Sequence, residues 1–127
     1  MSQTTAQRAM QVSVKAANMG FDWDCAADVL DKLAEELQEI RQALNNGDTQ
    51  THLTEEIGDL YFALVNLTRK LQINPDQAFE QGVSKFERRF QALQTIIAQS
   101  NRSVSELTAD ELDAVWQLVK SGENHAR

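Results

Sequence analysis

The chain has 127 residues, a hydrophobic fraction of 42% and a net charge of −7. This composition is typical of one globular domain and excludes a disordered chain. The acidic balance argues against a sequence-independent nucleic-acid binder, which needs a basic face, but a bound divalent cation would still allow anionic ligands.

The cysteine content and the N-terminal segment indicate in which cellular compartment the protein is expected. The single cysteine, Cys25, cannot form an internal disulfide, which is compatible with a reducing cytoplasm. The N-terminal MSQTTAQRAM has no apolar core of signal-peptide length, and no stretch approaches the roughly 18 apolar residues of a membrane span. We therefore expect a cytoplasmic protein that does not contact a membrane.

Apolar residues recur with a helical period almost throughout the chain. A first helix is predicted over about residues 5–19. It ends at GFDWD (20–24), where Asp22 or Asp24 can cap the second helix. NNGD (45–48) then predicts a turn after that second helix. The apolar stripe of the second helix is made by Leu30, Leu33, Leu37, Ile40 and Leu44.

The remaining elements are also predicted to be helical. The third helix contains LTEEIGDLYFALVNL (53–67) and continues to about Ile73. NPDQ (74–77) opens a fourth helix, with Asn as the cap and Pro at the first helical position. QSNRS (99–103) predicts a loop, and TADE (108–111) is a capping box that opens a fifth helix.

Together these elements predict an all-α fold. We expect one domain over residues 1–127, built as a bundle of four to five helices, with a core over about 8–120 and a frayed tail at 121–127. The bundle either closes its own core or is completed by dimerisation, since the leucine-rich stripes are long for so small a chain.

The second and third helices each carry a pair of acids beside the apolar stripe. At about 100° per residue, Glu36 and Glu39 share one flank of the second helix, and Lys32 lies on the same side. Glu56 and Asp59 share one flank of the third helix. The other residues on that flank are His52, Ala63 and Asn66. Glu35 and Glu55 point away from both stripes.

The short turn makes these two helices antiparallel. Glu36 and Asp59 lie equally far from the turn, and so do Glu39 and Glu56, so the four carboxylates meet at one height. Like charges at helical spacing cost a few tenths of a kcal/mol per pair, and their repetition in register predicts a compensating cation. Carboxylates without Cys or His suit Mg²⁺, Mn²⁺ or Ca²⁺, and substrate phosphates usually complete an Mg²⁺ site.

A second cluster provides positive charge. Lys85 and Arg89 stand four residues apart in SKFERRF (84–90) and flank an apolar stripe, whereas Arg88 points outward. Lys120 follows Trp116 by one turn. Lys and Arg hold phosphate oxygens directly, so these cations fit a phosphorylated ligand.

The acidic motifs resemble those of a known family. EELQE (35–39) followed by EEIGD (55–59) is similar to the EExxE and ExxD metal signature of the MazG-type, all-α nucleoside triphosphate pyrophosphohydrolases. The resemblance covers about residues 8–120, includes KFERRF and VWQLVK (115–120), and is strongest to the C-terminal domain of two-domain MazG proteins. One departure is Val83, where the family commonly has a polar Asn.

The resemblance implies Mg²⁺-dependent hydrolysis of a (d)NTP to the monophosphate and pyrophosphate, with Mn²⁺ as a possible substitute. Water would attack the α-phosphorus, and Glu35 or Glu39 would be its general base. Dimers or dimers of dimers are implied as well. The implied metal ligands are Glu36, Glu39, Glu56 and Asp59, the four acids that the helical projection selects. The implied substrate-binding residues are Lys32, Lys85, Arg89, Lys120 and Trp116, to which we add Trp23 and Asn66.

Two other functions are compatible with a helical bundle that carries acidic residues. A di-iron bundle would use Glu-x-x-His pairs, and the sequence contains none. A non-catalytic nucleotide-binding or helical partner module is the principal alternative, because intact ligands do not prove turnover. Gly58 lies inside the third helix, where glycine is unfavourable, and we suggest that another helix packs closely against it.

Overall fold

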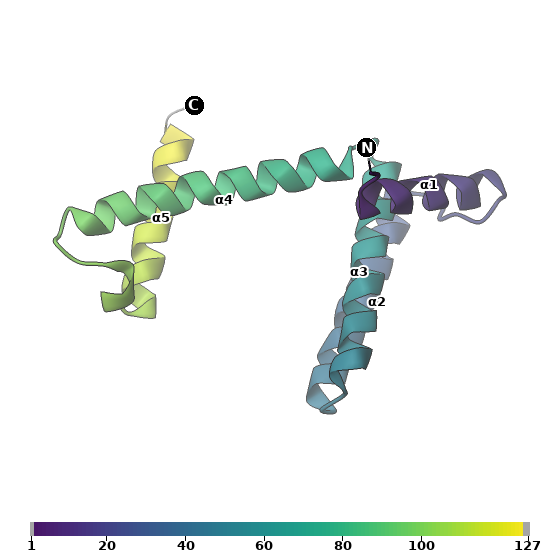
Figure 1. The fold of residues 1–127 in the computed structure, drawn as a ribbon, viewed down its shortest axis with the longest axis horizontal. Coiled ribbons are helices and arrows are strands. Elements are labelled where there is room, and N and C mark those ends of the chain that lie inside the picture. Colours follow the sequence, from purple (N-terminus) through teal and green to yellow (C-terminus); the bar gives the residue numbers. More distant parts are fainter. Residues whose placement is uncertain (1, 126–127) are drawn as a thin grey trace. The chain divides into compact units, whose positions relative to one another are not determined.

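The computed structural model describes residues 2–125, and within that range it is helical without strands, which confirms the all-α prediction. None of the helices in this range combines the length and apolar character that crossing a membrane requires. The chain divides into two units, Met1–Ala78 and Phe79–Arg127, and each is described by itself. The α-helices, labelled in Figure 1, are α1 (Thr5–Asn18), α2 (Ala26–Asn45), α3 (Gln50–Lys70), α4 (Pro75–Ala98) and α5 (Ala109–His125). A short 3₁₀ helix, η1 (Val104–Glu106), lies between α4 and α5.

The first unit is built on an antiparallel hairpin of α2 and α3, which lie side by side in Figure 1, and α1 packs on α3. The turn between α2 and α3 forms where predicted. Gly47 has a φ of 67°, a left-handed conformation that glycine adopts without strain. Thr49 then caps α3, since its hydroxyl accepts a hydrogen bond from the His52 backbone N–H at 3.2 Å.

The contact between α2 and α3 has the predicted register. The buried residues of α2 recur every seven positions, at Val29, Glu36 and Ala43, and those of α3 are Ala63 and Asn66. Val29 and Asn66 are fully buried and lie equally far from the turn, as Glu36 and Asp59 do. Small side chains such as Ala43 and Ala63 allow the two helices to approach closely at these positions.

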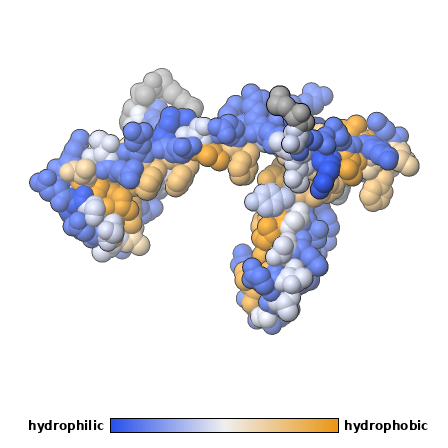
Figure 2. All heavy atoms as spheres, in the orientation of Figure 1, coloured by the Kyte–Doolittle hydropathy of each residue, from blue (hydrophilic) through white to orange (hydrophobic). Residues whose placement is uncertain are grey.

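Three residues of the leucine stripe of α2 lie outside this contact. Leu30, Leu37 and Leu44 have exposed fractions of 54%, 56% and 63%, so these positions do not close a core within the chain, and their completion by dimerisation stays a prediction. Each helix of a two-helix hairpin buries only one side against its partner, and here the acid-bearing side is used. Figure 2 shows apolar residues at the surface of the hairpin.

Asp22 joins the segment before α2 to the C-terminal end of α3. The predicted capping of α2 by Asp22 or Asp24 is wrong, because the N-cap is Cys25, which makes no side-chain capping bond. Asp22 is instead paired with Arg69 and, at 2.9 Å, with Lys70. These two cations lie in the last turn of α3, where positive charge also stabilises the helix dipole.

Most predicted helix ends agree with the structure to within a residue or two. The exception is α3, which ends at Lys70 rather than near Ile73, because Gln72 takes a left-handed φ of 58° and the Ile73 N–H returns to the Thr68 carbonyl at 2.8 Å. Asn74 caps α4 through the Gln77 N–H at 3.0 Å. The predicted tail is helical as far as His125, and residues 126–127 lie outside the described range.

The second unit has its own small core. Leu93 and Ile97 of α4 are buried with Val119 of α5, and side chains of η1 and α5 pack around them. The predicted capping box holds α5 in place, since the Thr108 and Glu111 side chains each accept the other's backbone N–H, at 3.2 Å and 2.9 Å. The sequence prediction missed η1, although Ser103 and Glu106 form a second capping box there.

Replacing Asp22 with Asn should lower the melting temperature, because Arg69 and Lys70 lose the carboxylate between them. Hydrogen bonds from these two cations hold the pKa of Asp22 below its ordinary value. The stability they provide is therefore present above the unfolded-state pKa of about 3.9 and is lost as the pH falls below it. Thermal unfolding of both proteins between pH 3 and 7 should show the difference shrinking in acid. Asp24→Asn, at an exposed position, is the control, and an equal loss in both variants would contradict the pairing.

Candidate functional site

Three carboxylates from α2 and α3 form one group in the first unit. Glu36, Glu56 and Asp59 each place one oxygen within 4.8 Å of the others. Glu36 is only 4% exposed, Glu56 is half-buried and Asp59 is exposed, so the group runs from the helix contact to the surface. The hairpin register brings together three of the four acids whose meeting the helical projection predicted, and Glu39 is not in this group.

Two oxygens of this group lack a partner. Glu36 Oε2 and Glu56 Oε2 are buried and accept no hydrogen bond within the described part of the chain. A buried carboxylate oxygen without a donor is costly, and such groups normally pair with a cation or coordinate a metal. The donor set contains only hard oxygens, which matches Mg²⁺, Mn²⁺ or Ca²⁺. These residues therefore fit a divalent cation.

Glu39 lies beside this group on α2. Hydrogen bonding with Glu56 raises the pKa of Glu39, and partial burial acts in the same direction. The two side chains are thus close enough for one proton to relieve their repulsion. The other two acids of these motifs are exposed as predicted, and Glu35 lies 3.6 Å from Lys32.

Lys32 is engaged with the acids. Its Nζ lies 3.1 Å from Glu36 Oε1, and the hydrogen bond to that carboxylate raises the pKa of Lys32. Lys32 is thus paired with Oε1 of Glu36, while Oε2 of the same carboxylate stays unpaired. A phosphate contact by Lys32 stays a prediction.

Asn66 belongs to a buried polar network. It is 2% exposed, its side-chain oxygen accepts from the Ser13 hydroxyl, and its amide donates to the Phe62 carbonyl at 3.2 Å. Ser13 in turn accepts from Arg69 Nε at 2.6 Å, which links the network to Asp22. Ser13 and Arg69 were not predicted from the sequence, and the signal for Ser13 was a lone polar residue among the apolar positions of α1.

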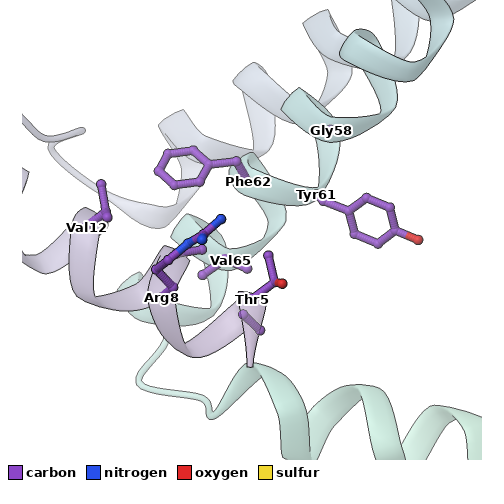
Figure 3. A pocket seen from close by; sticks show the side chains of 9 residues that line it. Thr5, Arg8, Val12, Gly58, Tyr61, Phe62 and Val65 are labelled. Atoms are coloured by element: carbon purple, nitrogen blue, oxygen red, sulfur yellow. The ribbon is translucent and has the colours of Figure 1, made fainter. Parts of the chain in front are cut away.

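Trp23 and Gly58 were two further residues of interest. Trp23 is half-buried, and its backbone N–H donates to Asp22 at 2.8 Å. A Cβ added to Gly58 would meet no atom within 4 Å, so close helix approach does not explain this glycine. Gly58 instead lines an apolar pocket of about 590 Å³, whose labelled side chains in Figure 3 come from α1 and α3. None of the predicted site residues lines this pocket.

The other predicted basic and aromatic residues, Lys85, Arg89, Trp116 and Lys120, lie in the second unit. Arg89 is paired with Glu123, with Nε 2.9 Å from Oε2. The ring of Trp116 packs against Phe86, with centroids 5.6 Å apart. Lys85 is exposed and Lys120 is half-buried. Within this unit, therefore, cations and an aromatic surface come from both α4 and α5.

Comparison with known proteins agrees with these features. Residues 25–93 match the MazG nucleotide pyrophosphohydrolase domain. The chain belongs to this family. The matched segment contains Glu36, Glu39, Glu56 and Asp59, so the carboxylate group described above lies wholly within the MazG domain.

Curated MazG relatives match over most of the chain. The nucleoside triphosphate pyrophosphohydrolase of Escherichia coli K12 is 38% identical over 120 residues, and the nucleoside triphosphate pyrophosphohydrolase/pyrophosphatase MazG of Thermotoga maritima is 34% identical over 115. Each alignment covers 91% of this chain but 44% of the relative. The chain thus spans less than half the length of these relatives.

A divalent cation should stabilise this MazG domain, because it would satisfy the unpaired oxygens of Glu36 and Glu56. At a concentration about 100 times the Kd, binding adds about 2.7 kcal/mol to the free energy of unfolding. Melting curves with Mg²⁺ or with EDTA should show this gain, and Glu36→Gln should remove most of it. Glu55→Gln, an exposed acid on the same helix as Glu56, is the matched control. Equal cation-dependent shifts in both variants would contradict the assignment.

Proposed function

We propose that this chain is a nucleoside triphosphate pyrophosphohydrolase that converts a (d)NTP to the (d)NMP and pyrophosphate. The observation that carries the proposal is the carboxylate group of α2 and α3, with two buried unpaired oxygens, inside a MazG domain. The names of the Escherichia coli and Thermotoga maritima relatives support the same reaction class.

The proposed cation is Mg²⁺, with Mn²⁺ as a substitute. Its ligands would be Glu36, Glu39, Glu56 and Asp59, whose oxygens suit a hard divalent ion. When bound, such an ion supplies positive charge for the triphosphate oxygens and lowers the pKa of a water molecule.

The proton of the attacking water needs an acceptor. Glu39 is not one of the three residues whose oxygens group together, so of the four proposed ligands it is the one least committed to the cation and our first candidate for this proton, with Glu35 as the second. The proposed phosphate-binding residues are Lys32, Lys85, Arg89 and Lys120, which would stabilise the charge that leaves with pyrophosphate. Trp116 and Trp23 are the candidates to contact the base.

Asn66 has a less direct part in this proposal. Its side chain is already bonded to Ser13 and Phe62, so it supports the helix that carries Glu56 and Asp59. Contact between Asn66 and the substrate is also proposed, and it would require the hydrogen bonds of Asn66 to Ser13 and Phe62 to break. As the structure stands, these bonds hold α3 in the register that places Glu56 and Asp59.

We further propose that the protein self-associates. The exposed leucines of α2 recur every seven residues, at Leu30, Leu37 and Leu44, which is the spacing of a helix-packing seam. A second copy would bury them, giving a homodimer or a dimer of dimers. No nucleic acid or membrane is part of the proposal.

The decisive experiment is product analysis with a panel of (d)NTPs and Mg²⁺. Phosphate should appear only after inorganic pyrophosphatase is added, because the expected product is pyrophosphate. Orthophosphate released without that enzyme would indicate a different cleavage. Tight nucleotide binding without any product would favour the non-catalytic nucleotide-binding module.

Glu39→Gln and Asp59→Asn should each reduce turnover by at least about 100-fold, since even outer residues of metal sites commonly contribute factors of 10–100. Circular dichroism should show unchanged helix content, because Asp59 is exposed and Glu39 is half-buried. Glu55→Gln serves again as the matched control. Wild-type turnover by either variant at subsaturating Mg²⁺ would refute the ligand assignment.

A further inference from the structure

His52 lies on the same flank of α3 as the carboxylate group. It occupies the first turn of the helix, four residues before Glu56, so the two side chains are neighbours on one face. The imidazole is 45% exposed and therefore accessible to ions from solvent. The proposed cation ligands are all carboxylates, and His52 has no role among them.

One nitrogen of His52 faces two carboxylates. Nε2 lies 3.5 Å from Glu56 Oε1 and 3.7 Å from Asp48 Oδ2. Both distances exceed the roughly 2.7–3.2 Å of an ordinary N–H···O hydrogen bond. They come close to the separation of two donors on one ion, which is about 3.0–3.4 Å when each lies about 2.1 Å from the metal.

Glu56 connects this imidazole to the buried acids. Its Oε1 faces His52, while its Oε2 is buried and unpaired. That second oxygen belongs to the carboxylate that stands within 4.8 Å of Glu36 and Asp59. Glu36 itself is 4% exposed and has its own unpaired oxygen. His52 is not one of these three residues, so its nitrogen reaches the group only through the carboxylate of Glu56.

We infer that His52 supplies Nε2 as a ligand to the cation bound by Glu56, and that the centre thereby gains affinity for divalent transition-metal ions relative to Mg²⁺. Imidazole is a good ligand for first-row transition metals, whereas Mg²⁺ strongly favours oxygen. The inference rests on the proposed function only in using the same cation site.

The test is pulsed electron paramagnetic resonance of the Mn²⁺-loaded protein, without a histidine tag and in a buffer free of amines. We expect ¹⁴N modulation from a directly bound imidazole in the wild type and its loss in His52→Gln. The matched control is His125→Gln, because the chain contains only these two histidines. Calorimetry with Co²⁺ and with Mg²⁺ should show the preference for Co²⁺ falling by about 10-fold in His52→Gln and staying unchanged in the control.

Each outcome is decisive. Mn²⁺ binding that depends on Glu36 and gives no nitrogen modulation would overturn the role of His52 and leave the proposed function standing. Nitrogen modulation lost with His52, together with no pyrophosphate release, would support the ligand and refute the hydrolase. Absence of any divalent cation binding by the wild type would overturn both. Circular dichroism of His52→Gln checks that α3 is intact.

Discussion

The close approach of carboxylates across the α2/α3 hairpin is the constraint on which the functional interpretation depends. Glu36 lies in the helix contact itself, a position normally taken by an apolar side chain, and one of its oxygens has no donor within the described chain. Such an arrangement opposes folding unless positive charge compensates it. Lys32 supplies part of that charge, and a divalent cation would supply the rest.

Packing and hydrogen bonds within the first unit hold the α2/α3 hairpin together despite the repulsion between its carboxylates. Alanines at the contact allow the helices to approach closely, and Val29 of α2 and Asn66 of α3 are fully buried. The network from Asn66 through Ser13 and Arg69 to Asp22 then fixes α1 and the segment before α2 to the far end of α3. Polar groups that are fully bonded in this way specify one packing, whereas the carboxylate group remains electrostatically unsatisfied. That contrast separates the fully paired polar network of the unit from the carboxylate group that could hold a cation.

The sequence predicted the meeting of the acids better than it predicted the packing around them. The acid register follows from helix geometry and turn length, which are local quantities, and the structure agrees with it at Glu36, Glu56 and Asp59. The leucine stripe was predicted either to close the chain's own core or to be completed by dimerisation, and Leu37 is 56% exposed. Periodicity shows which residues share a face but not which of two adjacent faces meets a partner. The same limit explains why Asp22 was assigned to a helix cap rather than to Arg69, which lies 47 residues away in the chain.

By itself, the sequence determined the all-α class, the turns, the capping boxes and the set of acids that lie at one height, because these depend on spacing and local propensity. Only the tertiary structure decided that Glu36 is buried, that oxygens of Glu36 and Glu56 lack partners, and that Nε2 of His52 faces Glu56. Burial and pairing depend on the atoms supplied by the neighbouring helix, and a linear pattern does not contain that information. The chemistry of the site therefore comes from short acidic motifs, and its electrostatic character comes from the contact between two helices.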